Sequence, residues 1–252
     1  MVEEATGLDV VEHILVHDRH GEKASLLEGG KVASVGLAEL LSTADLVIEC
    51  ATPAVVRTVL EGTLERGADV MILSSGGLVD PDLRSWAAET ASRSGSTISV
   101  PSGAIGGIDV LKAASIGKID RFELNTVKHP GSVRPSEAFA DEVGIDPMSI
   151  RERTLIFEGP PDEAIRYFPR NVNVSSTLAI AASAGADLTV RVFLDPSVER
   201  NRHELVVEGD FGRMTLTLDN VPSSETPGTS ELAVLSATAT LRALVRRTKI
   251  GT

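Results

Sequence analysis

The sequence predicts an α/β protein with two domains: a doubly wound, Rossmann-type domain and a second, mixed-sheet α+β domain. Three observations support this prediction. Short apolar runs alternate with amphipathic segments in the first half, strand patterns with few helices dominate the second half, and 252 residues exceed one ordinary domain. We place the domains at residues 1–100 and 101–226, and expect a C-terminal helix in 227–252 to pack back on the first domain.

Four apolar runs in the first half predict parallel strands, over residues 11–16, 45–49, 70–73 and 97–100. Helical segments connect them. A short helix is expected over 35–41; a second has Thr52 as its N-cap and Pro53 at its first position, and a third opens at Asp80. Strands and helices that alternate in this way are typical of parallel βαβ units.

Five further runs predict strands in the second half, over residues 122–128, 154–157, 188–194, 204–207 and 213–218. In the last run Met214, Leu216 and Leu218 alternate with threonines, which indicates a strand with one buried face. Helices are expected over 171–184 and 231–245. Because so few helices are available to cover this sheet, one apolar face would stay open, and we expect a homodimer through this domain.

Composition excludes several classes of function. Lys and Arg total 24 and Asp and Glu total 36, a net charge of −12, whereas nucleic-acid binding needs a basic face. The single Cys excludes an internal disulfide and a multi-Cys metal cluster, which favours a reducing, cytoplasmic location and no metal site. No apolar run reaches the roughly 18 residues of a membrane helix, and residues 1–15 lack the basic region of a signal peptide.

Candidate ligand-binding residues follow the predicted strands of the first half. Ligands of open parallel sheets bind beyond the carboxyl ends of the strands. An acid at position 18 would accept hydrogen bonds from an adenosine ribose, although a plain strand-ending turn explains it too. Cys50 fits a small buried residue better than a nucleophile, because no motif supports the second role. The candidates at the three strand ends are Asp18 and Arg19, Cys50 and Ala51, and Ser74 and Ser75.

The second half offers a glycine-rich turn and a polar helix start. Three glycines in residues 101–107 allow a ligand to approach the backbone closely, at the junction of the two halves where domain clefts hold sites. Arg170, Asn171 and Asn173 place a cation and two amides at the start of a helix, which suits a carboxylate or an amide ligand. A plain Asn cap explains the same residues equally well.

Three further side chains of the second half are candidates for chemistry. His203 follows a loop and is suited to act as a general acid or base. Lys128 and His129 end a predicted strand, where they would bind an acidic substrate or remain solvated. Neither histidine has a Cys or carboxylate at metal-ligand spacing, so these residues do not predict a metal site.

The glycine fingerprint Gly-x-Gly-x-x-Gly of a dinucleotide-binding domain is absent from the sequence. We expect the true start to lie upstream, because the strand that carries the fingerprint is central in a doubly wound sheet. It would lie between the strands predicted over 11–16 and 45–49. Without it, the 252-residue form is expected to be poorly soluble or inactive, since a buried strand edge would remain unpaired.

Five segments taken together resemble the L-aspartate dehydrogenase family: residues 49–53, 101–111, 168–174, 195–203 and 222–230. Their order and spacing run over roughly residues 10–247. The resemblance implies a Rossmann domain, a mixed α/β catalytic domain and oxidation of L-aspartate with NAD or NADP. The product iminoaspartate would hydrolyse to oxaloacetate and ammonia or feed NAD biosynthesis.

The resemblance also implies roles for single residues. His203 matches the family's catalytic histidine, Ala104 and Asn173 match its NAD contacts, and Asp18 matches the acid after the second strand. Asp18 predicts that NAD is preferred, while Arg19 would tolerate the 2′-phosphate of NADP. Two alternatives stay open: another Rossmann reductase, of the dihydrodipicolinate reductase or homoserine dehydrogenase type, and a binding or regulatory protein that cannot hold the cofactor.

Overall fold

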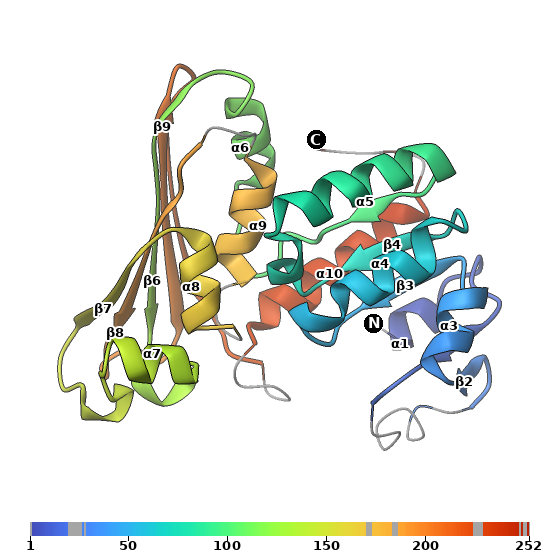
Figure 1. Cartoon of the computed structure of the whole chain (residues 1–252), viewed down its shortest axis with the longest axis horizontal. Coiled ribbons are helices and arrows are strands. Elements are labelled where there is room, and N and C mark those ends of the chain that lie inside the picture. The colour runs from blue at the N-terminus through green and yellow to red at the C-terminus, as the bar shows by residue number, and fades with distance from the viewer. Residues whose placement is uncertain are drawn as a thin grey trace. The chain divides into compact units, whose positions relative to one another are not determined.

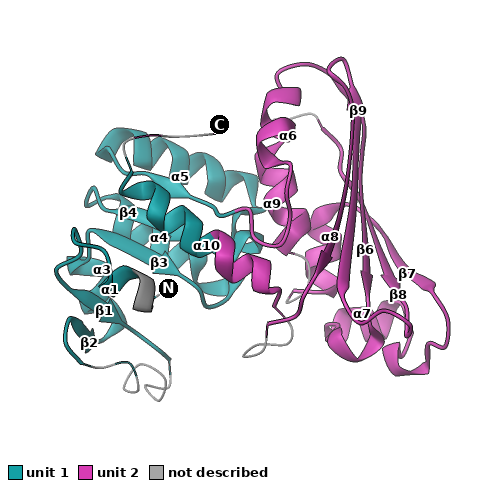
Figure 2. Cartoon of the chain, turned by 180° about the vertical axis from the view of Figure 1, so that it is seen from behind, with its two compact units in different colours: residues 1–101, 237–247 teal, residues 102–236, 248–252 magenta. Residues whose placement is uncertain are grey.

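The computed structural model of the chain describes residues 2–19, 27, 29–169, 173–182, 186–223, 229–246, 248 and 251 (Figure 1). The chain forms two compact units, coloured separately in Figure 2. Unit 1 comprises residues 1–101 and 237–247, and unit 2 comprises residues 102–236 and 248–252. The final helix, α10 (Glu231–Leu244), therefore begins in unit 2 and ends in unit 1.

Unit 1 contains two parallel sheets. The smaller sheet pairs β1 (Ile14–Val16) with β2 (Val32–Ser34). The larger has the order β3 (Leu46–Glu49), β4 (Asp69–Ile72) and β5 (Ile98–Ser99). The predicted parallel βαβ arrangement is confirmed, although the sequence did not predict β2. In the described residues no strand joins β1 to β3, the two strands between which the fingerprint strand was expected.

The helices of unit 1 show how local sequence sets their ends. The helix α5 opens at Asp80 as predicted, and the Asp80 side chain caps it by accepting hydrogen bonds from the backbone N–H groups of Asp82 and Leu83. Thr52 does not act as predicted: a 3₁₀ turn intervenes before α4, and the Thr52 side chain makes no capping hydrogen bond. The helical segments are α1 (Val2–Thr6), α3 (Leu37–Thr43), η1 (Pro53–Val55), α4 (Val56–Leu64), η2 (Ser75–Leu78) and α5 (Pro81–Ser94).

Unit 2 is built on one five-stranded mixed sheet, which confirms the predicted fold class of the second half. Its order is β10-β9-β6-β8-β7, and β6 and β8 form the parallel pair of an otherwise antiparallel sheet. A hairpin joins β9 to β10, with Gly209 paired to Gly212 across its turn. The strands are β6 (Ile119–Lys128), β7 (Thr154–Gly159), β8 (Thr189–Leu194), β9 (Asn201–Gly209) and β10 (Gly212–Asn220).

Helices cover one face of this sheet (Figure 1). The inner face is aliphatic, and an aromatic cluster packs in the same core, with the ring centroids of Phe139 and Phe168 4.9 Å apart and those of Phe157 and Tyr167 5.7 Å apart. The helical segments are α6 (Ile108–Ala114), η3 (Pro130–Ser132), α7 (Glu137–Glu142), η4 (Pro147–Ser149), α8 (Pro161–Tyr167) and α9 (Asn173–Ala181).

These helices show that the expectation of an uncovered apolar face on this sheet is wrong. The apolar face does not need a partner subunit to cover it. Residues of the helices and their flanks, such as Phe139, Phe168 and Leu178, are packed against it. The sequence reasoning missed α7 and α8, since each is shorter than the periodic pattern that indicates a helix. The homodimer itself stays a prediction.

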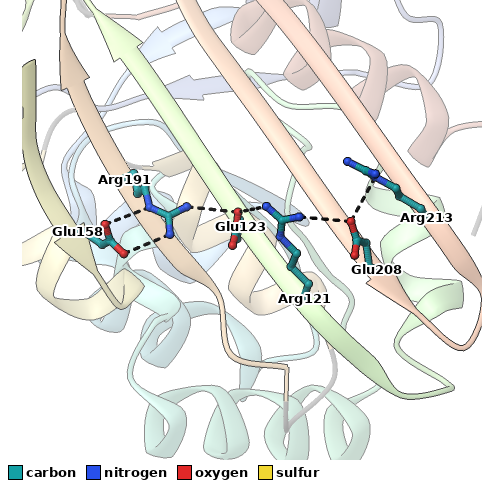
Figure 3. A network of polar contacts seen from close by, with 6 residues as sticks. All are labelled: Arg121, Glu123, Glu158, Arg191, Glu208 and Arg213. Carbon is teal, nitrogen blue, oxygen red and sulfur yellow. Dashed lines mark hydrogen bonds and ion pairs between the residues drawn. The ribbon is translucent and has the colours of Figure 1, made fainter. Parts of the chain in front are cut away.

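The outer face carries a row of alternating charges that crosses all five strands (Figure 3). Glu123, at its centre, accepts from Arg121 at 2.8 Å and lies 3.2 Å from Arg191. The Arg121 hydrogen bond is the largest of the causes that hold the pKa of Glu123 below its usual value. This face is polar and partly solvated, so each ion pair adds at most about 1 kcal/mol. The row consists of Arg213, Glu208, Arg121, Glu123, Arg191 and Glu158.

None of the helices among the described residues combines the length and apolarity that a membrane span needs.

Candidate functional site

The inner face of the second sheet changes from apolar to polar toward one end. Leu124 on β6 lies opposite Leu205 on β9, and two residues further along Thr126 lies opposite His203. Lys128 follows at the next inward position of β6. Because side chains alternate along a strand, these buried polar groups share one face with the aliphatic core. The sheet therefore presents a buried polar row, formed by Thr126, His203 and Lys128, at one end of its core.

His203 is held inside the protein as a neutral imidazole. Its residue surface is 3% exposed, and Nδ1 lies 3.0 Å from the Oγ1 atom of Thr126. Burial, and then the nearby Lys128 cation, lower the pKa of His203 from 6.5 to about 3. At neutral pH one ring nitrogen therefore keeps a lone pair. When Nδ1 carries the proton and donates to Thr126, that lone pair is on Nε2.

Lys128 is a buried cation. Its residue surface is 5% exposed, and burial lowers the pKa of its ammonium group from 10.5 to about 8, so that it remains largely charged at neutral pH. Among the described residues, no carboxylate forms an ion pair with it. A buried charge is costly unless a partner of opposite sign offsets it. Lys128 is therefore suited to bind an anionic group of a ligand.

In unit 1, Glu49 brings together the predicted residues at the ends of β3 and β4. The sequence analysis did not select Glu49. Glu49 is 4% exposed, and its Oε1 accepts from the Ala51 N–H at 2.7 Å and the Ser74 hydroxyl at 2.9 Å. Its Oε2 accepts from the Ser74 N–H at 3.0 Å. Ser74 and Ser75 are buried, whereas Cys50 and Ala51 are exposed. The carboxylate thus connects the two strand-end loops.

The Cys50 thiol is not an activated nucleophile. The residue retains exposed surface, but burial of the thiol, and secondly the Glu49 carboxylate, raise the pKa of Cys50 above its usual value. A raised pKa keeps the sulfur protonated at neutral pH, and the thiolate is the reactive form. At the end of β1, Asp18 is half-buried and Arg19 is exposed.

The remaining predicted residues lie in different settings. The Ala104 carbonyl accepts from the Asn220 side chain at 2.9 Å, and Asn173 is exposed at the first position of α9. His129 is exposed and caps η3, because its Nδ1 accepts from the Gly131 N–H at 3.1 Å. The structure thus gives His129 a local structural contact. Arg170 and Asn171 lie outside the described residues.

Sequence reasoning missed Thr126 and Glu49. Thr126 resembles any other β-branched residue of a strand, and only the register of β6 against β9 places it beside His203. Glu49 could have been found, because an acid directly after the apolar run 46–48 is unusual in a buried parallel strand. Within the described part of the chain, no three His, Cys, Asp or Glu side chains gather in a way that could hold a metal ion.

Comparison with known proteins places the chain in a family. Residues 109–244 match the family described as aspartate dehydrogenase, C-terminal. The L-aspartate dehydrogenase of Methanosarcina barkeri is 39% identical over 231 residues, which cover 92% of this chain and 85% of that protein. That of Methanocella arvoryzae is 42% identical over 216 residues, covering 86% and 80%. The chain belongs to the L-aspartate dehydrogenase family.

The family assignment agrees with the fold of both units. Residues 5–101 match the family described as homoserine dehydrogenase, NAD binding domain, so unit 1 of this dehydrogenase is a nicotinamide-nucleotide-binding domain. The crystal structure of aspartate dehydrogenase from Thermotoga maritima superimposes with a TM-score of 0.77 at 26% identity, covering 99% of this chain and 94% of that one. The protein is an oxidoreductase of the amino-acid dehydrogenase class.

The buried neutral state of His203 predicts how stability depends on pH. The unfolded chain binds a proton near pH 6.5, whereas the folded chain binds it only near pH 3. Stability is therefore lost as the pH falls through this window, by about 2 kcal/mol at pH 5. Urea unfolding of the parent and of His203→Gln at pH 7 and pH 5 measures the effect. We expect the parent to lose about 2 kcal/mol more than the variant.

The exposed His13 supplies the control, because His13→Gln should lose as much stability as the parent between the two pH values. Equal losses for the parent and His203→Gln would show that His203 accepts a proton in the folded protein as readily as in the unfolded chain.

Proposed function

We propose that the protein oxidises L-aspartate to iminoaspartate with a nicotinamide nucleotide, NAD in preference to NADP. The iminoaspartate then hydrolyses to oxaloacetate and ammonia or is consumed in NAD biosynthesis. The observation that carries this proposal is the buried polar row, in which a neutral histidine lies beside a cation without a carboxylate partner in the described residues. The names of these relatives, both L-aspartate dehydrogenases, support the choice of substrate.

The reaction defines what the protein must provide. The substrate ammonium group loses a proton, the C–H bond at the α-carbon breaks with its electron pair leaving as hydride, and the nitrogen lone pair forms the C=N bond of the iminium ion, which loses a second proton to give the imine. The nicotinamide ring, when bound, supplies the hydride acceptor. The protein must hold a substrate with two carboxylates although its own net charge is −12, and must accept the proton that the substrate ammonium group releases.

His203 is the proposed general base. Its neutral ring has a lone pair, and the Thr126 hydroxyl fixes the ring by its contact with Nδ1. A base with a pKa of about 3 is weak; burial is the larger cause of the low value, and the Lys128 charge is the second. A substrate carboxylate beside Lys128 would offset this charge and raise the pKa of His203. Binding of the substrate would therefore strengthen the base that acts on it.

Lys128 is the proposed partner of one substrate carboxylate. Its charge is already buried, and among the described residues it has no ion pair that a carboxylate entering the site would have to replace. Arg170 and Asn171 stay proposals for the second carboxylate, and His129 is a further candidate despite its contact with Gly131.

The strand-end loops of unit 1 are the proposed cofactor-binding residues, together with Ala104 and Asn173. Cys50, Ala51 and Thr52 are exposed directly after the buried end of β3, so a ligand can reach their backbone at the carboxyl end of a parallel strand. These loops fit a nicotinamide nucleotide on this ground. Asp18 would accept hydrogen bonds from the adenosine ribose, which favours NAD.

Substitution of His203 tests its role in catalysis. The parent should reduce NAD with L-aspartate, and His203→Ala should lower kcat by roughly 10²–10⁴, as expected for loss of a general base. Calorimetric titration should show unchanged affinity for NADH, because His203 is not a proposed cofactor contact. The exposed His13 gives a matched control, since His13→Ala should keep the parental kcat.

Turnover of His203→Ala within a few-fold of the parent would remove His203 from the mechanism. A parent that binds NADH but does not oxidise L-aspartate would overturn the proposed substrate, and assays with other amino acids would follow.

Succinate, a dicarboxylate that lacks the amine and whose charge is constant above neutral pH, tests the role of Lys128. Its inhibition constant against L-aspartate should rise about tenfold per pH unit above about pH 8, where Lys128 loses its charge. Lys128→Met should bind succinate weakly at pH 7 and show no such rise. The same pH dependence in Lys128→Met as in the parent would assign the effect to another group.

The choice of cofactor gives a further prediction. The parent should have a higher kcat/KM with NAD than with NADP, and Asp18→Ser should narrow the difference, because the variant lacks the charge that repels a 2′-phosphate. Arg19→Ser should act in the opposite direction and lower kcat/KM with NADP. A parent that strongly prefers NADP would contradict the role proposed for Asp18.

A further inference from the structure

Glu49 is a buried carboxylate in the nucleotide-binding unit for which the catalytic proposal has no role. It shares the inward face of β3 with Val47, where an aliphatic residue would fit the core. Among the described residues no Lys or Arg forms an ion pair with it. Its three hydrogen bonds instead come from the ends of two loops, through Ala51 and Ser74. A buried charge held in this way is compensated by dipoles while its negative sign is retained.

The two loops that Glu49 connects are tightly packed. The loop after β3 leads into η1, and the loop after β4 leads into η2, where the Gly77 N–H donates to the Ser74 carbonyl at 2.9 Å. A Cβ atom at Gly77 would lie 2.5 Å from Val56 Cγ2, so only glycine allows this approach. Packing holds η1 and η2 together, and the hydrogen bonds of Glu49 hold the backbone at the ends of β3 and β4.

The hydrogen bonds of Glu49 also decide what these loops can bind. The N–H groups of Ala51 and Ser74 already donate to the carboxylate, so they are not available to a phosphate. The buried negative charge disfavours a phosphate further. A neutral or cationic part of a nucleotide is better suited to this position, and the nicotinamide ring is cationic when oxidised and neutral when reduced.

We propose that Glu49 is a positioning residue for the nicotinamide end of the cofactor: it holds the loops after β3 and β4, and its charge favours the oxidised ring. This inference rests on the proposed function, because it assumes that unit 1 binds the nucleotide through these loops. It differs from a purely structural role in one measurable respect. A structural role affects both redox forms of the nucleotide equally, whereas the charge affects the cationic form more.

Calorimetric titration of the full chain with NAD and with NADH tests the proposal. Glu49→Gln removes the charge, and we expect the affinity for NAD to fall about tenfold more than the affinity for NADH. Ser74→Ala keeps the charge and removes one hydrogen bond to it, so both affinities should fall in parallel. Glu49→Asp retains the charge and should keep the ratio of the two affinities near that of the parent.

Asp69 provides a matched control at the opposite end of β4. Its Oδ1 accepts from the Thr97 N–H at 2.7 Å, so Asp69→Asn also removes a carboxylate that binds a backbone amide. This variant should lose stability without changing either affinity at a temperature well below its unfolding transition.

An unchanged ratio of affinities in folded Glu49→Gln would overturn the proposed charge effect. If Glu49→Gln does not fold, parallel losses in Ser74→Ala support the part of the proposal in which Glu49 holds the loops, and unchanged affinities in Ser74→Ala and Glu49→Asp overturn it. If the parent binds both nucleotides, and Glu49→Gln and Ser74→Ala bind them with the parental affinities, this inference is wrong while the proposed function is unaffected. A parent that binds neither nucleotide overturns the proposed function as well.

Discussion

A charge removed from water needs a partner, and this requirement organises the functional parts of both units. Glu49 satisfies it with three hydrogen bonds from two loops. Lys128 has no carboxylate partner among the described residues, and its pKa is lowered to about 8 as a result of burial. The first arrangement is complete within the protein, whereas the charge of Lys128 is left without a carboxylate among the described residues and would be offset by the anionic ligand proposed for it.

The need to offset buried charge also explains why the two faces of the second sheet differ. On the outer face, arginines and glutamates alternate and compensate one another where water still reaches them. On the inner face, the strands are aliphatic until their polar end, where Thr126 and His203 meet. The helices cover the aliphatic part, so the sheet needs no partner subunit to bury it. The residues proposed for chemistry lie at the end of the sheet where polar side chains are buried.

The sequence predicts features that depend on neighbouring residues. It does not predict contacts that depend on how distant strands pair. Apolar runs predict the strands, and the cap at Asp80 is visible because its donors are two and three residues away. Thr126 cannot be selected, because its contact with His203 depends on the pairing of distant strands. Glu49 is visible in the sequence as an unusual acid at the end of an apolar run, but its partners in two separate loops are not. The short helices α7 and α8 have too few residues to establish a periodic pattern.

The alternation of β6 has a consequence for insertions and deletions. Arg121 and Glu123 point to the outer face, while Thr126 and Lys128 point inward, and all four lie beyond the irregularity between Ile119 and Arg121. Removing one residue after that irregularity would exchange the two faces, placing charges in the core and the polar row in solvent. Before it, the irregular segment can absorb a change of length. The spacing of this strand is therefore constrained as strongly as the identity of its side chains.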